Sequence, residues 1–321
     1  MNHDEVEKNI EKLNNILMNC TLCPRMCQIN RSAGEKGFCN LAKDMIISAA
    51  LPHHGEEPPL SGDKGAGTIF FSSCNLRCVY CQNYQISHTT KGYKVPVHQL
   101  SDIMLELQKL GCHNIEPVTP TPHIPAIMEA FLTAKKRGLL LPLVFNCGGY
   151  ERREIISLLN GLVDIYLPDF KYGIAKTGKD LSGVNDYPYQ AFNSLREMVC
   201  QVGDTLNLDE NKIANSGIIV RHLVLPGYVD NSIEALRMIR RVSTSIPLSI
   251  MAQYTPIKAV ENHPLLHRRI TKQEYEFIVN TALDLGFEEI YTQDVDDRTL
   301  NPDFNSNHPF DWNSTGEQIY V

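Results

Sequence analysis

The sequence predicts an α/β fold, namely a partial (β/α)6 barrel of the TIM type that follows an N-terminal cysteine-rich module. From about residue 66 onward, short apolar segments alternate with longer segments of helical period, which is typical of repeated βα units. About six such units are present, whereas a closed barrel needs eight. The residues before them lack this alternation and contain four cysteines. A doubly wound open sheet is the alternative architecture.

The predicted organisation has three parts. Residues 1–65 form the cysteine-rich metal-binding module, residues 66–300 the barrel, and residues 301–321, which are rich in Asn, Asp, Ser and Pro, a polar C-terminal tail. Near the N-terminus, Val6, Ile10, Leu13 and Leu17 recur at helical spacing in a polar segment, unlike the apolar centre of a secretory signal.

The expected strands are mostly continuous apolar segments, as buried parallel strands should be. They cover residues 68–71, 115–119, 141–145, 163–167, 218–225 and 247–252, with an additional candidate at 289–292. Gly111, Gly138 and Gly286 follow segments of helical period and are expected to end helices. Thr271 and Glu274 form a capping-box pattern that begins another helix. Ligand-binding residues of such folds collect where the parallel strands end.

Composition limits the function. The net charge of −7 argues against broad binding to nucleic acid, which depends on Lys and Arg. No run of about 18 apolar residues is present to span a membrane. We therefore expect a cytoplasmic protein. Ten cysteines in a reducing compartment are unlikely to form disulfides, so metal binding becomes the leading explanation for them.

Cys74, Cys78 and Cys81 lie in one loop directly after the first expected barrel strand. Three thiolates on a cubane of four irons leave one iron without a protein ligand, whereas an electron-carrying cluster is usually closed by a fourth cysteine. The open iron would accept a substrate or a cofactor. The alternatives are a zinc site, for which His88 is the available fourth ligand, or inert buried cysteines.

The loop resembles the CxxxCxΦC signature of the radical S-adenosylmethionine (radical SAM) superfamily, with Tyr80 as the aromatic residue before the third cysteine. The flanking segments GAGTIFFSSC, ending at Cys74, and CQNYQIS, beginning at Cys81, resemble the PflX-like branch related to pyruvate formate-lyase activating enzyme. This resemblance covers nearly the whole chain.

The resemblance implies a [4Fe-4S] cluster, S-adenosyl-L-methionine chelated to the open iron, and reductive cleavage to a 5′-deoxyadenosyl radical that abstracts hydrogen. It also implies an electron donor such as flavodoxin or ferredoxin. The substrate it suggests is a glycyl-radical enzyme, and the alternative is another protein, a peptide or a small molecule. A hypothesis of another class is an electron-transfer or metal-sensing iron–sulfur protein.

Several cofactor contacts follow from the resemblance. Tyr80 is similar in place to an aromatic residue near the adenine, although a core aromatic is the alternative. Many relatives have a Gly-Gly-Glu segment after the second strand, which this chain lacks, so Thr119 and Thr121 are the proposed replacements. Asn146 lies at the end of the third strand, where ligands bind.

Asp169 and Lys171 end the fourth strand and resemble the Asp-x-Lys that contacts the cofactor in activating enzymes. Their charges suit a zwitterionic methionine, and a surface ion pair is the alternative. Arg221 and His222 interrupt an apolar strand, and alternation allows only one of them to face the barrel interior. Arg221 resembles a residue that faces the cofactor, and a structural ion pair is the alternative.

Cys20, Cys23, Cys27 and Cys39 supply four thiols, enough to close a tetrahedral site. A second iron–sulfur cluster and a zinc ion both fit this number, and we favour the cluster. The adjacent Glu56 and Glu57 are expected in a solvated turn, with a position over the site as the alternative.

Overall fold

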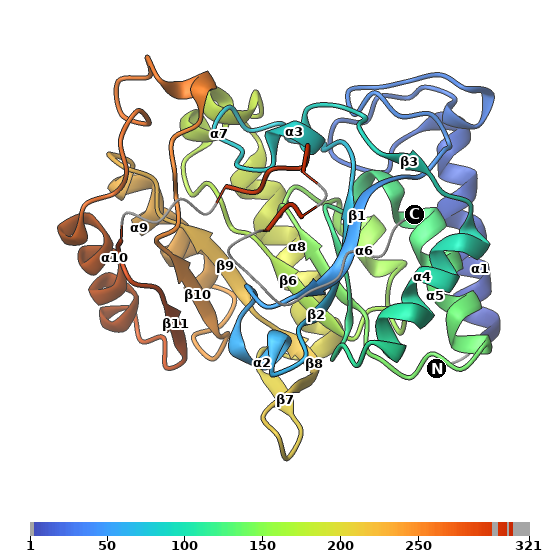
Figure 1. Ribbon diagram of the computed structural model, residues 1–321. Helices are drawn as coiled ribbons and strands as arrows, with labels where there is room; N and C mark the ends of the chain where they lie inside the picture. The colour runs from blue at the N-terminus through green and yellow to red at the C-terminus, as the bar shows by residue number, and fades with distance from the viewer. Residues whose placement is uncertain (1–2, 297–300, 307, 311–321) are drawn as a thin grey trace.

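The computed structural model describes residues 3–296, 301–306 and 308–310. Its centre is an eight-stranded sheet in the order β3-β1-β2-β4-β5-β6-β8-β7, beside a three-stranded sheet in the order β11-β10-β9 (Figure 1). The strands are β1 (Ile46–His53), β2 (Ala66–Phe71), β3 (Tyr93–Lys94), β4 (Ile115–Val118), β5 (Val144–Cys147), β6 (Ile165–Pro168), β7 (Leu206–Leu208), β8 (Ala214–Ile218), β9 (Val220–Leu223), β10 (Leu248–Met251) and β11 (Ile290–Thr292).

Helices surround the sheets. The α-helices are α1 (His3–Ile16), α2 (Pro58–Ser61), α3 (Tyr84–Ser87), α4 (Val97–Lys109), α5 (Ile124–Lys136), α6 (Arg153–Ser157), α7 (Ala175–Ser182), α8 (Tyr187–Val202), α9 (Val229–Arg240) and α10 (Lys272–Asp284). Helix α4 packs on β1, β2 and β4, helix α8 packs on β6 and β8, and α1 lies against α5 (Figure 1). Short 3-10 turns are η1 (Leu17–Asn19), η2 (Arg31–Ala33), η3 (Thr121–His123) and η4 (Lys258–Val260).

Backbone contacts join the two sheets into one parallel arc. The amide of Phe170 donates to the carbonyl of Arg221 at 2.7 Å, and Asp169 and Arg221 form a parallel bridge. Strands β2, β4, β5, β6, β9, β10 and β11 therefore run parallel in succession. This arrangement confirms an α/β fold with a mostly parallel sheet and is consistent with a partial TIM-type barrel.

Side-chain alternation gives the arc two different faces. Phe145 and Tyr166 belong to the large core beneath the helices. Their neighbours Val144, Ile165 and Leu167 instead pack with Leu60 of α2 on the opposite, concave face. Helix α2 thus fills one end of the barrel interior with apolar side chains. The polar residues lie at the other end, where the parallel strands have their C-termini.

The expected elements differ from the structure in several places. The strand expected at 141–145 lies at 144–147, and the one expected at 218–225 contains β9 and meets β8 only at Ile218. Strands β3 and β7 were not expected. Strand β1, within the expected N-terminal module, was missed and pairs antiparallel with β2. The capping box at Thr271 and the amphipathic N-terminal helix are confirmed. In the described part of the chain, no helix has the length and apolar character needed to cross a membrane.

Candidate active site at the strand ends

The three-cysteine loop follows β2 at the C-terminal edge of the parallel arc. Its backbone takes the left-handed region at Ser73 (φ 73°) and Arg77 (φ 53°), which non-glycine residues rarely adopt. The amide of Leu76 points at the thiol of Cys74, with 3.3 Å between nitrogen and sulfur. These turns curl the chain, so that Cys74 and Cys78 interact electrostatically with Cys81.

Hydroxyl groups contact two of the thiols. The hydroxyl of Ser182, at the end of α7, donates to Cys78 at 3.0 Å, and it is itself 2.6 Å from the Tyr172 hydroxyl. The hydroxyl of Ser87 in α3 lies 3.2 Å from the sulfur of Cys81. Such donors favour the thiolate form, which is the form that binds metal.

In the absence of metal, burial raises the thiol pKa of two cysteines of the loop. It raises the pKa of Cys74, and together with Cys78 it raises the pKa of Cys81 to about 12. Metal binding must therefore release protons from these thiols, and metal affinity will increase with pH.

Lys171 and Asp169 form an ion pair beside the thiols. Each side chain keeps 21% of its surface exposed. Burial opposes the charge of Lys171, but Asp169, Cys78 and Cys81 outweigh it and raise the pKa of the ammonium group. The predicted ion pair is therefore partly buried rather than a surface pair, and Lys171 faces the cysteine loop.

The donors of this loop fit an iron–sulfur cluster better than a single ion. Four ligands of one zinc ion, each about 2.3 Å from the metal, must lie within about 4 Å of one another. Across residues 3–296, 301–306 and 308–310, no three His, Cys, Asp or Glu side chains are arranged to hold one metal ion. His88, the zinc ligand considered from sequence, instead contacts the carbonyl of Cys78 at 3.1 Å.

Other predicted cofactor contacts lie at the same edge. Tyr80 is buried, with its ring 6.5 Å from Tyr172 and 6.3 Å from Tyr254. Thr119 has a φ of 58°, unusual for a β-branched residue, and its amide donates to the carbonyl of Asn146 at 3.0 Å. Backbone strain of this kind gathers at binding sites. Thr121 instead donates to Glu151 at 2.9 Å.

Arg221 has carboxylate partners inside the barrel. Its Nε donates to Glu57 at 2.8 Å, and Nη2 pairs with both Glu56 and Glu57. Glu56 and Glu57 are buried, so the expectation of a solvated turn was wrong. Helix α2 begins directly after them and inserts Leu60 into the barrel, which carries both carboxylates inward. His222 points the other way and contacts Ser232 of α9 at 2.8 Å, which confirms the predicted alternation.

Glu116 is a buried residue that sequence reasoning missed. Its Oε1 accepts a hydrogen bond from Asn146 at 2.7 Å, whereas Oε2 has no hydrogen-bond partner within the described part of the chain. Burial, and then the charge of Glu56, raise the pKa of Glu116 well above its ordinary value. A charged residue inside an apolar strand was the available signal, as it was for Arg221.

The described part of the expected C-terminal tail crosses the segment that follows Cys81. Gln82 donates to Asn301 at 2.9 Å, Gln85 donates to Asp303 at 3.0 Å, and Lys91 donates to the carbonyl of Phe304 at 2.7 Å. Residues 307 and 311–321 of that tail lie outside the described residues. The three-part division of the chain stays a prediction.

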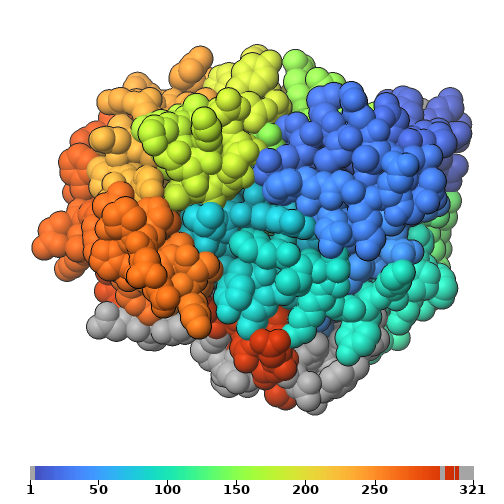
Figure 2. All heavy atoms as spheres, turned by 90° about the horizontal axis from the view of Figure 1, so that it is seen from above, coloured from blue at the N-terminus to red at the C-terminus, as the bar shows by residue number. Residues whose placement is uncertain are grey.

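Figure 2 shows this face of the molecule from above. The cyan segment that follows β2 lies at its centre, with the blue N-terminal residues on one side and the yellow-green and orange segments on the other. The cysteine loop is therefore surrounded by chain from both halves of the sequence.

Comparisons with known proteins agree with the position of this loop. The sequence model of the radical SAM superfamily matches residues 68–174, which run from β2 past Lys171 and include all three cysteines. The uncharacterized protein MJ0674 of Methanocaldococcus jannaschii is 30% identical over 295 residues, which cover 89% of this chain and 80% of that protein. MJ0808 of the same organism is 22% identical over 317 residues, covering 89% and 84%.

Two solved structures were also similar. SuiB of Streptococcus suis, bound to S-adenosylmethionine, has a TM-score of 0.47 and 12% identity. The match covers 69% of this chain and 45% of SuiB, so the chain spans about half of that protein. Methylornithine synthase (PylB) has a TM-score of 0.45 and 14% identity, with 70% and 63% covered. The chain therefore belongs to the same family as MJ0674, and its residues 68–174 match the radical SAM superfamily.

Proposed function

We propose that this protein binds a [4Fe-4S] cluster through Cys74, Cys78 and Cys81 and reductively cleaves S-adenosyl-L-methionine. When bound, these groups supply the electron and the sulfonium from which a 5′-deoxyadenosyl radical forms. The observation that carries the proposal is the single loop of three thiols at the strand ends, with Lys171 interacting with two of them.

The ion pair supplies charges for the methionine part of the cofactor. The ammonium group of Lys171 suits a carboxylate, and the carboxylate of Asp169 suits an amino group. Since both side chains keep part of their surface exposed, a zwitterion can reach them without the full cost of burying a charge. Tyr80, Thr119 and Asn146 remain proposed contacts of the cofactor. The two carboxylates on Arg221 favour the structural ion pair over a cofactor contact for that residue.

The test compares wild-type protein with Cys78→Ala after anaerobic reconstitution with iron and sulfide. Addition of dithionite and S-adenosylmethionine to the wild type should release 5′-deoxyadenosine and methionine in equal amounts. Cys78→Ala should lose the iron of this cluster and the product. The matched control is Cys200→Ala, because Cys200 is exposed on α8 and distant in sequence from the loop. No 5′-deoxyadenosine from fully loaded wild type would favour the electron-transfer or sensing alternative.

The natural substrate is proposed as a glycyl-radical enzyme, with reduced flavodoxin or ferredoxin as the electron donor. Support comes from the motif resemblance to activating enzymes. A candidate protein labelled with deuterium at its glycine α-carbons should transfer deuterium to 5′-deoxyadenosine. The activase proposal would be wrong if 5′-deoxyadenosine stayed unlabelled with every such candidate. Deuterium transfer from a different labelled peptide or small molecule would then identify the alternative substrate class.

A further inference from the structure

We propose that Cys20, Cys23, Cys27 and Cys39 form a separate metal centre that holds the Cys74 loop in position. The four cysteines line one small cavity, together with Leu22, Ile29 and Phe38. Asn75, the neighbour of Cys74, also lines it. Four thiols around one space are a donor set for an iron–sulfur cluster, whereas no three ligands within the described residues are arranged to hold a single ion.

The local backbone brings the four thiols together. The amide of Cys20 donates to Ile29 at 2.8 Å, and the amide of Gln28 donates back to Cys20 at 2.9 Å, which closes the loop containing Cys23 and Cys27. The amide of Phe38, next to Cys39, points at the sulfur of Cys27 at 3.4 Å. A Cβ atom at Gly37 would lie 2.8 Å from that sulfur, so only glycine allows this approach.

This segment has little regular structure. Between α1 and β1, it contains the two three-residue turns η1 and η2. Leu22 and Met45 join the main core, and the irregular chain around them gains few backbone hydrogen bonds to offset its conformational entropy. Small modules of this kind are commonly stabilised by a structural metal.

Arg25 connects the centre to the three-cysteine loop. It lies between Cys23 and Cys27, and its guanidinium group donates to the carbonyls of Asn75 and Ser182, at 2.9 Å each. Ser182 is the residue whose hydroxyl contacts Cys78. The hydroxyl of Ser73 donates to the carbonyl of Cys39 and so makes a second connection. Metal that fixes Cys23, Cys27 and Cys39 therefore also fixes both sides of Cys74.

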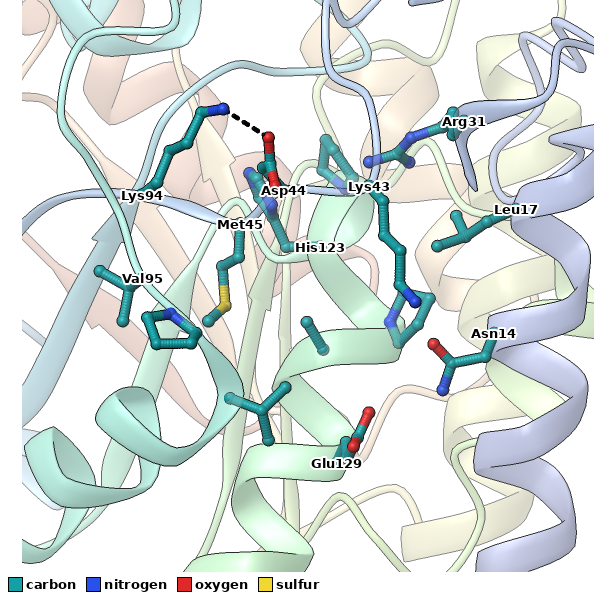
Figure 3. A pocket seen from close by; sticks show the side chains of 15 residues that line it. Asn14, Leu17, Arg31, Lys43, Asp44, Met45, Lys94, Val95, His123 and Glu129 are labelled. Atoms are coloured by element: carbon teal, nitrogen blue, oxygen red, sulfur yellow. Dashed lines mark ion pairs between the residues drawn. The ribbon is translucent and has the colours of Figure 1, made fainter. Parts of the chain in front are cut away.

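A second cavity adjoins the four-cysteine cavity on its outer side. Arg31 and Pro122 line both the four-cysteine cavity and a second cavity of about 330 Å³ between α1, α4 and α5. Figure 3 shows this second cavity, with the ion pair of Lys94 and Asp44 on one side and Arg31 on another. The centre is thus separated from the outer cavity by a single layer of side chains.

The metal test uses a full-length variant in which Cys74, Cys78 and Cys81 are all alanine, so failure of the proposed function does not affect it. After anaerobic reconstitution with iron and sulfide, this variant should retain about four irons with four sulfides per chain. About one zinc per chain instead would overturn the iron–sulfur assignment. Further replacement of Cys20, Cys23, Cys27 and Cys39 by alanine should remove the iron. Equal metal content in both variants would overturn the site.

The positional role is tested with Arg25→Met and, as the matched control, Arg152→Met. Arg152 also joins the N-terminal segment to the barrel, through the carbonyl of Thr21 at 2.7 Å, but does not contact the cysteine loop. Arg25→Met should keep its N-terminal metal and show about tenfold faster amide hydrogen exchange in residues 75–81, as expected from a lost hydrogen-bonded contact. Unchanged exchange in Arg25→Met, or an equal increase in Arg152→Met, would contradict the role.

Discussion

Arg221 and its carboxylate partners form a group of buried charged side chains in the barrel interior. Burial disfavours the charge, yet Glu56 and Glu57 raise the pKa of the guanidinium group, and Arg221 lowers the pKa of Glu56. Arg221 and Glu56 therefore depend on each other for their charged forms. Removal of one partner leaves the rest buried without compensation.

Arg221→Met should lower the free energy of unfolding by about 3–5 kcal/mol, because Glu56 and Glu57 lose their cation. Arg237→Met is the control, since Arg237 pairs with Glu234 at an exposed site, where about 0–1 kcal/mol is expected. Both are measured by urea unfolding. Similar values for the two variants would show that the buried pair has no special role in stability.

Glu116 makes the free energy of unfolding depend on pH. The pKa of its carboxyl group is raised in the folded state, whereas in the unfolded chain the same group ionises at the ordinary value of about 4.3. Above that value the folded protein binds more protons than the unfolded one, and stability falls as pH rises towards the folded pKa. Glu116→Gln should remove this decline, which amounts to as much as about 1.4 kcal/mol per pH unit.

The measurement is urea unfolding at intervals between pH 5 and pH 8. Glu106→Gln, at an exposed site on α4, is the control and should follow the wild type. A Glu116→Gln curve parallel to the wild type would mean that Glu116 is ionised in the folded protein.

For single residues, the sequence predicted that a charged side chain faces inward but not which residues it pairs with. The apolar neighbours of Arg221 predicted that it or His222 faces inward, and the structure confirms the alternation. Its partners lie 164 and 165 residues earlier in the chain, and no local pattern predicts such a contact. The solvated turn expected for Glu56 and Glu57 was wrong for the same reason.

Among the elements, the loop after β5 positions the Asp169 backbone. Gly149 has a φ of 76°, and a Cβ atom there would lie 2.1 Å from the carbonyl oxygen of Asp169. Loop and strand end thus approach more closely than any other residue permits. The same strand end carries the ion pair of Asp169 and Lys171.

Gly149→Ala should displace Asp169 and weaken binding of S-adenosylmethionine to the reconstituted protein by about tenfold or more, the equivalent of one lost charged hydrogen bond. Gly138→Ala is the control, since Gly138 also has positive φ but no atom within 4 Å of its Cβ position. Equilibrium dialysis measures both. Equal affinity of the two variants for S-adenosylmethionine would show that the position of the Asp169 backbone does not affect cofactor binding.

Prediction of the elements succeeded where the physical signal was local. Strands β2 and β4 and the start of α10 follow from apolar segments and a capping box. Strand β1 is largely apolar, but it was missed because it was assigned to the N-terminal module, and it pairs antiparallel with β2 rather than as part of a βα unit. Strand β2 was already predicted as the first strand of the barrel, and nothing in the sequence indicated that another strand pairs with it on its other side.

Considered as a whole, the molecule packs the described part of its C-terminal segment near the cysteine loop. Phe304 and Phe310 from the C-terminal segment pack with Phe70 of β2, at ring distances of 5.4 Å and 5.0 Å. The same cluster contains Ile86 of α3, directly after the cysteine loop. The polar composition of residues 301–321 concealed these aromatic contacts, and a polar tail was predicted instead.

Phe304→Ala should lower the free energy of unfolding by about 3 kcal/mol, the lower end of the range for a buried Phe. It should also increase proteolytic cleavage between residues 301 and 306, because the segment loses its anchor. Phe277→Ala, at a residue of α10 that is 54% exposed, is the control. Unchanged cleavage in Phe304→Ala would show that the hydrogen bonds to Gln82, Gln85 and Lys91 suffice.

The central claim is that the cluster on Cys74, Cys78 and Cys81 has one iron open to S-adenosylmethionine. Its most direct test is the electron paramagnetic resonance spectrum of the dithionite-reduced cluster, recorded before and after the cofactor is added. We use the wild-type protein, and the variant in which Cys74, Cys78 and Cys81 are alanine supplies the background signal of the N-terminal centre. The account predicts that the cofactor changes the g values of the cluster signal. A spectrum that stays the same at saturating cofactor would contradict it.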